Sequence, residues 1–143
     1  MKNVRIKGFT LIELMIGLIV VAVLVSLALP SFRDTLRKSR RSDAMNAIMD
    51  IHMSQERYRV NNPTYGTLSQ VKNIVPAVSS LASPDGHYSL TVTGNTATSY
   101  TIVAATVVGD DQANDSCGDF TLAFTAGVIT KTADGTDDLC WKK

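Results

Sequence analysis

The fold is decided by one stretch of sequence, residues 8–30, which reads GFTLIELMIGLIVVAVLVSLALP. From Phe9 to Leu29 this stretch is apolar, apart from one charge at Glu13 and three small or polar residues, Thr10, Gly17 and Ser26. At about 1.5 Å of rise per residue, a helix of this length spans roughly 31 Å, close to the hydrocarbon thickness of a bilayer. The segment therefore predicts a helix that is surrounded by a membrane or by other helices.

Glu13 is the anomaly of this segment. A carboxylate inside the apolar part of a membrane helix costs on the order of 2.5 to 3.5 kcal/mol on the most lenient insertion scale. One interpretation is that Glu13 lies near the interface and is solvated by lipid head groups. The interpretation that we favour gives it a cationic partner, because ionisable residues within membranes are by default functional.

A candidate partner arises at the start of the segment. Three basic residues, Lys2, Arg5 and Lys7, precede the small residue Gly8. A peptidase that cut after Gly8 would leave a new α-amine on Phe9, and this amine is a natural counter-charge for Glu13.

The run Lys7-Gly8-Phe9-Thr10-Leu11-Ile12-Glu13 resembles the prepilin signature of type IV pilins and type II secretion pseudopilins. The resemblance implies that prepilin peptidase cleaves between Gly8 and Phe9 and N-methylates Phe9. It also implies that Glu13 of one subunit pairs with the Phe9 amine of a neighbour in a filament core, where low dielectric strengthens the pairing and penalises an unpaired register.

Two other interpretations of the N-terminus remain open. The small residues of Ser26-Leu27-Ala28 fit a signal peptidase site, and cleavage after Ala28 would release a soluble domain. Alternatively the chain is a plain single-span membrane protein. The basic residues that follow the span favour a cytoplasmic C-terminal domain by the positive-inside rule, whereas the cysteine pair favours export; these basic residues are Arg33, Arg37, Lys38, Arg40 and Arg41.

Residues 31–60 predict a second, amphipathic stretch of helix. They contain neither Gly nor Pro, and one core-facing stripe recurs at mostly three- and four-residue steps. The stripe consists of Leu36, Ala44, Ile48, Ile51, Gln55 and Tyr58. Pro30 is expected to kink or loosen the helix where the two stretches meet, because it lacks an amide hydrogen.

After a connecting loop at residues 61–86, with room for one short helix, the period of the pattern changes to two. The expected strands are Tyr88–Thr93, Tyr100–Val107, Phe120–Thr125 and Val128–Lys131. Such a small sheet needs the helix to cover one of its faces. The predicted fold class is α+β: a long N-terminal helix on a four-stranded antiparallel sheet.

Cys117 and Cys140 are the two cysteines of the chain. They are too far apart for a CxxC redox motif and too few alone for a zinc site. In a chain with an export-like segment they predict one disulfide, which would pin the C-terminal tail to the sheet.

The expected organisation is a cleaved leader at residues 1–8, a transmembrane and filament-core helix at 9–30, and a globular head at 31–143. In the head, residues 31–60 form the amphipathic helix, 61–86 the loop, and 87–143 the sheet and disulfide-closed tail. This is the arrangement of type IV pilins. A finer similarity to PilE-type minor pilins is carried by Arg57-Tyr58, Asn61-Asn62, Tyr65, Cys117-Gly118 and Cys140-Trp141.

No catalytic, cofactor or metal site is predicted. The only histidines are His52, on a helix and expected at the surface or rim, and His87, beside a strand, and no motif positions a nucleophile near them. An acidic loop matches no EF-hand spacing, so we expect solvated turns rather than a calcium site; it contains Asp110, Asp111, Asn114, Asp115 and Asp119. The basic run Arg33 to Arg41 is expected to be a solvated, salt-paired helix face.

The sequence thus predicts a structural subunit of a type IV pilus, serving adhesion, twitching motility or DNA uptake. The resemblance implies as partners other pilins, prepilin peptidase and an inner-membrane assembly machine, with the chain single-pass in a bacterial inner membrane and later in an extracellular pilus. The alternatives are a type II secretion pseudopilin and a competence-type pilin that binds DNA or a surface. DNA is the less favoured partner, because 14 basic residues face 13 acidic ones and three of the basic residues lie in the leader.

Overall fold

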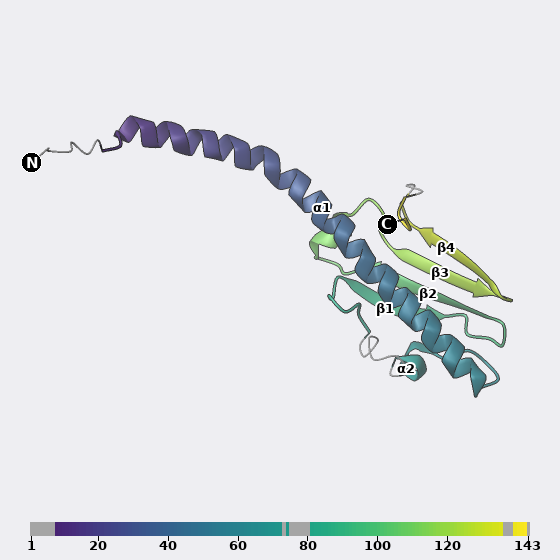
Figure 1. The fold of residues 1–143 in the computed structure, drawn as a ribbon. Helices are drawn as coiled ribbons and strands as arrows, with labels where there is room; N and C mark the ends of the chain where they lie inside the picture. Colours follow the sequence, from purple (N-terminus) through teal and green to yellow (C-terminus); the bar gives the residue numbers. More distant parts are fainter. Residues whose placement is uncertain (1–7, 73, 75–80, 136–138, 143) are drawn as a thin grey trace, which may run out of the picture. The chain divides into compact units, whose positions relative to one another are not determined.

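The computed structural model describes residues 8–72, 74, 81–135 and 139–142, apart from the side chain of Pro30. Its elements are α1 (Leu11–Val60), α2 (Leu68–Val71), β1 (Tyr88–Thr93), β2 (Ser99–Thr106), the 3-10 helix η1 (Asp111–Asn114), β3 (Phe120–Thr125) and β4 (Val128–Ala133) (Figure 1). By its internal contacts the chain divides into two units, Met1–Thr35 and Leu36–Lys143.

The first unit contains the apolar part of α1. An 18-residue window has a mean hydropathy of 2.8, and none of it is buried against the rest of the protein. Side chains such as Leu18 and Leu24 are more than half exposed. The predicted apolar helix is therefore confirmed, and its length and composition suffice to cross a membrane. The helix does not end at position 30, and the leader residues before Gly8 lie outside the described residues.

In the second unit, residues 36–60 of α1 lie along one face of the sheet (Figure 1). Ala44, Ile48, Ile51 and Gln55 are fully buried, as the stripe predicted. Tyr58 is partly buried against the same core. Leu36 does not fit the prediction: it is 37% exposed, because it precedes the part of α1 that packs on the sheet. Burying a large aliphatic side chain such as Ile48 contributes about 1.5 to 3 kcal/mol.

The sheet is an antiparallel meander in the order β1-β2-β3-β4. Its core-facing residues alternate along the strands and include Tyr88, Leu90, Tyr100, Ile102, Phe120 and Leu122. β3 and β4 are joined by Ala126 and Gly127 alone, with φ of 50° and 88°. Positive φ at both central residues is the two-residue turn whose twist suits a hairpin. The predicted α+β fold with four antiparallel strands is confirmed, although β2 begins and ends one residue earlier and β4 reaches Ala133.

One buried amide fixes the connection after α1. Gln55 donates from Nε2 to the carbonyl of Gly66 at 2.6 Å and accepts from the Gly66 amide at 2.8 Å. A Cβ on Gly66 would lie 2.9 Å from Cγ1 of Val71. The loop therefore needs glycine at this position for a close approach, and α2 is the short helix for which the sequence left room.

The predicted disulfide is present. Cys117 and Cys140 are joined with a Cα–Cα distance of 5.7 Å, and both are buried. The tail is also held by Trp141, whose Nε1 donates to the carbonyl of Thr132 at 2.8 Å and whose ring packs edge-on against Phe120. Together these contacts close the C-terminal tail onto the sheet.

Candidate functional site

The N-terminus of α1 carries the residues that the sequence singled out for processing and assembly. Phe9 is almost fully exposed, and the Glu13 amide donates to Oγ1 of Thr10 at 3.3 Å. Phe9 and Glu13 border the same shallow groove of about 370 Å³ along the helix, together with Gly17. Within the described residues no cation lies within ion-pair distance of the Glu13 carboxylate. The segment thus presents an apolar surface with one negative charge, which is suited to packing against other helices.

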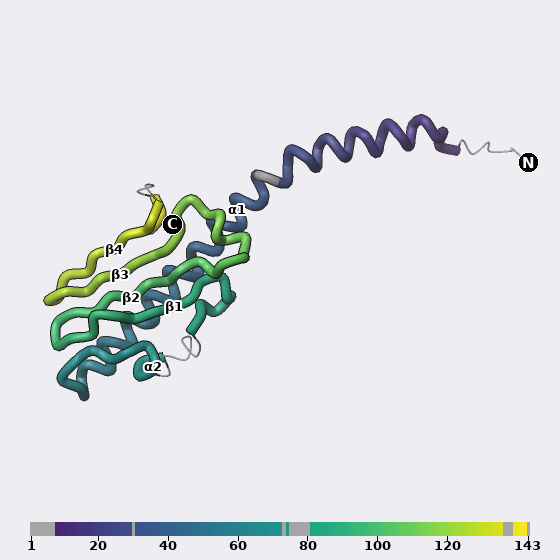
Figure 2. The backbone as a smooth tube through the Cα atoms, turned by 180° about the vertical axis from the view of Figure 1, so that it is seen from behind, coloured from purple at the N-terminus to yellow at the C-terminus, as the bar shows by residue number. Residues whose placement is uncertain are grey.

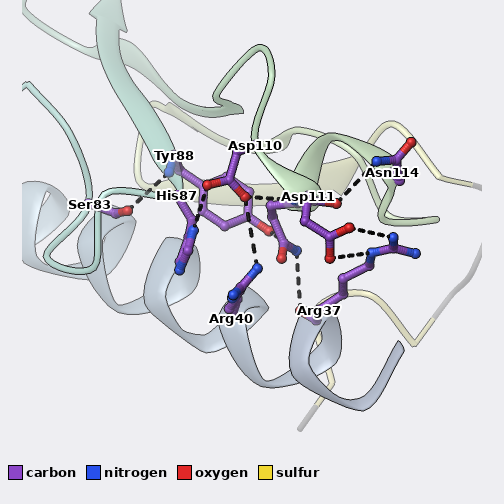
Figure 3. Close-up of polar contacts among 9 residues, drawn as sticks. Arg37, Arg40, Ser83, His87, Tyr88, Asp110, Asp111 and Asn114 are labelled. Carbon is purple, nitrogen blue, oxygen red and sulfur yellow. Dashed lines mark hydrogen bonds and ion pairs between the residues drawn. The ribbon is translucent and has the colours of Figure 1, made fainter. Parts of the chain in front are cut away.

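The head contains a second site, which the sequence did not predict as one unit. Three arginines of α1 meet three aspartates in and around η1. Figure 3 shows two of these pairs, Arg37 with Asp111 and Arg40 with Asp110. We call this set the arginine–aspartate clasp; it consists of Arg37, Arg40, Arg41, Asp110, Asp111 and Asp115.

The deepest pair of the clasp is that of Arg41 and Asp115. The guanidinium donates from Nε and Nη2 to the two carboxylate oxygens at 2.8 and 2.7 Å, and from Nη2 to Oγ of Ser116 at 3.1 Å. The two side chains are only 10% and 3% exposed. A buried bidentate pair of this kind is costly to break, because removal of one partner leaves the other charge unsolvated.

The other pairs of the clasp lie closer to solvent. Arg37 donates to the two carboxylate oxygens of Asp111 at 3.1 and 2.8 Å, and the Asp111 side chain is 40% exposed. Asp110 lies between Arg40 and His87, with Nδ1 of His87 3.0 Å from its carboxylate (Figure 3). The Gln112 amide and His87 hold the pKa of Asp110 below its usual value.

Local structure explains why η1 reaches the helix. Asp110 caps η1 by accepting from the Gln112 amide at 2.8 Å. The Gln112 side chain is fully buried, and its Nε2 donates to the carbonyl of Arg37 at 3.2 Å and to the hydroxyl of Tyr88 at 2.8 Å. Burial raises the pKa of Tyr88 to about 12, so this hydroxyl remains protonated.

The clasp confirms that the basic run of α1 is salt-paired, and it corrects the expectation that this run and the acidic loop are solvated. Arg37, Arg41 and Asp115 lie mostly out of solvent, where the charges neutralise one another across α1 and η1. Asp119 accepts from the amide and hydroxyl of Thr106. In the part of the chain that the structure describes, no three acidic, histidine or cysteine side chains are grouped closely enough to hold a metal.

His52 lies at the rim of the core, as expected. Its Nδ1 is hydrogen-bonded to the hydroxyl of Tyr100, and its ring neighbours Phe124. Burial lowers the pKa of His52 below its ordinary 6.5. These contacts give His52 a structural role at the junction of α1 and the sheet.

Basic side chains outside the clasp gather where α1 ends. Arg59 donates to the carbonyls of Asn62 and Ala97, and its guanidinium lies over the ring of Tyr65. Arg57 and Lys72 make no ion pair with any described residue. In the part of the chain that the structure describes, this end of the head therefore presents Arg57 and Lys72 without an ion pair, although the exposed Glu56 lies on the same turn of α1 as Arg57. The sequence analysis did not identify this feature.

Comparison with known proteins places the chain among the pilins. The family model for "Type IV minor pilin ComP, DNA uptake sequence receptor" matches residues 30–121, and that for the "Prokaryotic N-terminal methylation motif" matches residues 3–29. The first match covers well over half of the chain, so the protein belongs to this family of type IV minor pilins. It is a family of pilins and not of enzymes.

Individual relatives cover less of the chain. It is 32% identical over 79 residues to the type IV major pilin protein PilE1 of Neisseria gonorrhoeae, a match that covers 50% of this chain and 48% of the relative. It is 30% identical over 66 residues to type II secretion system core protein G of Pectobacterium carotovorum subsp. carotovorum, covering 46% and 42%. The fimbrial protein EcpC of Eikenella corrodens is 48% identical over 40 residues, covering 28% and 26%. The chain thus spans less than half the length of these relatives.

Proposed function

We propose that the protein is a minor subunit of a type IV pilus and that its N-terminal helix builds it into the filament. The observation that carries the proposal is the apolar start of α1. None of this segment is buried within the subunit, and its single charge is that of Glu13. Exposed apolar surface on this scale marks a segment that is buried in a membrane or an assembly.

The processing steps form part of the proposal. Prepilin peptidase cuts between Gly8 and Phe9 and methylates the Phe9 amine, which keeps its positive charge. The chain is then held in the inner membrane by residues 9–29, with the head outside the cytoplasm, until the assembly machine transfers it to the filament. Export of the head is supported by the buried disulfide between Cys117 and Cys140, since such bonds persist in oxidising compartments.

In the filament, the Glu13 carboxylate of one subunit pairs with the Phe9 amine of its neighbour. This pair offsets the free-energy cost of a carboxylate in an apolar environment. It stabilises only the register of neighbouring helices in which the two charged groups meet. Pro30, at the end of the apolar segment, marks the place where the helix leaves the filament core.

Two measurements test the proposal. The intact mass of protein extracted from sheared filaments should correspond to a chain that begins at N-methylated Phe9, and a chain that begins elsewhere contradicts it. Glu13→Val should be processed normally yet fail to enter filaments, whereas the control Leu18→Val, on the same apolar stretch, should enter. Equal incorporation of both variants would remove the pairing.

DNA binding is a second candidate function. It is supported by the matching family, which is described as a DNA uptake sequence receptor, and by Arg57 and Lys72, which make no ion pair with any described residue. A protein that neutralises phosphates with a few cations binds more weakly as salt rises. Arg57→Gln with Lys72→Gln should lower the retention of duplex DNA and flatten its salt dependence, while Lys38→Gln serves as control. No retention by the wild-type protein at low salt would exclude this candidate.

The relatives also include type II secretion proteins, so a pseudopilin role is the third candidate. Deletion of the gene separates it from the first two. Loss of surface filaments or of DNA uptake supports a pilin, whereas loss of exoprotein secretion with intact filaments supports a pseudopilin.

A further inference from the structure

A groove of about 510 Å³ lies between α1 and the C-terminal tail of the head. The tail wall of this groove is held where β3 begins and β4 ends, by the disulfide of Cys140 and by the hydrogen bond from Trp141 to Thr132 (Figure 2). Both walls are therefore in place before any ligand enters, as in most ligand sites. From α1 the groove is lined by Lys38, Ser39, Ser42 and Met45, and from the tail by Leu139 and Lys142.

The polar side chains of the groove are donors that the protein leaves unused. Lys38 and Lys142 make no ion pair with any described residue, and no described carboxylate lines the groove. The hydroxyls of Ser39 and Ser42 likewise make no hydrogen bond within the described residues. Two ammonium groups and two hydroxyls directed to one groove suit an anion with several oxygen acceptors, such as a phosphate group.

The rest of the groove is apolar. Met45 is buried beside the lysines, and Leu139, on the opposite wall, is 58% exposed. A free phosphate ion would leave this apolar surface in water, whereas a phosphate ester that carries hydrocarbon would cover it.

We propose that this groove binds the head group of an anionic phospholipid. Lys38 and Lys142 contact the phosphate, and Ser39 and Ser42 donate hydrogen bonds to its oxygens. The glycerol and the first acyl carbons pack against Met45 and Leu139. Duplex DNA offers the same phosphate chemistry but no hydrocarbon for the apolar wall, so the groove favours the lipid.

The chain itself keeps the groove near lipid head groups. Only nine positions separate Lys38 from Leu29, the last apolar residue of the segment that our proposed function places in the membrane. Nine residues span at most roughly 32 Å in any backbone conformation. Such a tether raises the effective concentration of head groups at the groove, so a modest intrinsic affinity is enough. This step rests on the proposed function, whereas the binding itself can be measured on isolated subunits.

The test is native mass spectrometry of the full chain released from neutral detergent micelles that contain equal amounts of phosphatidylglycerol and phosphatidylcholine. The wild-type protein should retain phosphatidylglycerol in preference. Lys38→Gln with Lys142→Gln should reduce this preference about tenfold, because two charge-assisted contacts to the phosphate are lost. Arg57→Gln with Lys72→Gln removes the same charge outside the groove and should leave the preference unchanged.

Two further arms identify the source of the phosphate. Leu139→Ala should weaken retention of phosphatidylglycerol, since it removes part of the apolar wall. Inorganic phosphate or duplex DNA, added at the concentration of the lipid, should not displace it. The urea midpoint of each variant checks that it is folded.

Any of three results would overturn the inference. The first is that the wild-type protein retains both lipids equally. The second is that the folded lysine variant keeps the wild-type preference, since the lipid would then bind elsewhere. The third is displacement of the lipid by inorganic phosphate or by duplex DNA, since the groove would then be a site for that ligand. If the lipid preference is absent while filaments still form, the proposed pilus function stands.

Discussion

The arginine–aspartate clasp allows a sharp test of how burial governs the contribution of an ion pair. We expect Asp115→Ala to lower the free energy of unfolding by about 3 kcal/mol, because it leaves the Arg41 guanidinium, 10% exposed, without its carboxylate. The matched change Asp111→Ala should cost less, about 1 kcal/mol, because this pair lies nearer to solvent: Arg37, which is left behind, is 17% exposed, and Asp111 is 40% exposed, so water has access to the guanidinium.

A double variant separates the charge from the packing. Arg41→Met with Asp115→Leu replaces the buried pair by apolar side chains and should recover most of the loss, to within about 1 kcal/mol of the wild type. High salt should reduce the small effect of Asp111→Ala and change that of Asp115→Ala far less, because salt screens exposed pairs most.

The assay is urea unfolding of the full chain in detergent, followed by the fluorescence of Trp141. This is the only tryptophan of the chain, and it packs against Phe120 in the head, so the apolar helix does not obscure the signal. In a thermal melt, 3 kcal/mol corresponds to a drop of roughly 12 to 24 °C for a domain of this size. Equal losses for Asp115→Ala and Asp111→Ala would refute the argument that burial sets the difference.

Three further predictions concern the head. Cys117→Ser with Cys140→Ser should lower the free energy of unfolding by about 3 kcal/mol through loss of the closed loop, as measured by urea unfolding. As a check, the urea midpoint of this double variant should shift no further than that of Cys117→Ser alone under reducing conditions. Gly66→Ala should cost about 1 to 3 kcal/mol, because its Cβ would lie 2.9 Å from Val71, and an unchanged midpoint would show that the loop yields freely. The pKa of His52 is lowered in the folded state, so below about pH 6.5 the unfolded chain binds more protons than the folded chain, and the free energy of unfolding falls from pH 7 to pH 5. His52→Gln should flatten this dependence on pH. An equal slope in the variant would show that other groups cause the pH dependence.

The elements of the head could be predicted from sequence because their patterns are local. The period-two runs place each strand to within a residue or two. In β1, β2 and β3 one face is buried, and a slip of one residue would reverse it. The stripe through Ala44, Ile48 and Ile51 identified the face of α1 that packs on the sheet. Leu36 was assigned to this face wrongly, because periodicity does not show how far the sheet extends.

The clasp could not be predicted from local patterns. The partners in its two bidentate pairs are 74 residues apart in sequence, and each cluster alone resembles a solvated surface. The signal that was present was complementarity: a basic run on a helix and an acidic loop of similar size occur in one small domain. The burial of Gln112, which brings η1 onto α1, has no signature in the sequence. The proposed assembly residues, in contrast, could be identified from a local pattern, because a single charge such as that of Glu13 in an apolar run is visible in the sequence alone.

The order of the strands has a consequence for how the head reaches its native state. Every strand pairs with its neighbour in sequence, so the sheet can grow one hairpin at a time with short loops to close, which is the low contact order of fast folders. The part of α1 that covers the sheet precedes every strand in the chain. Its apolar side therefore has no sheet to pack against until the strands, which begin at Tyr88, have formed. The core is then completed only when the helix docks on the growing sheet, because a sheet this small is not stable without a helix over one of its faces.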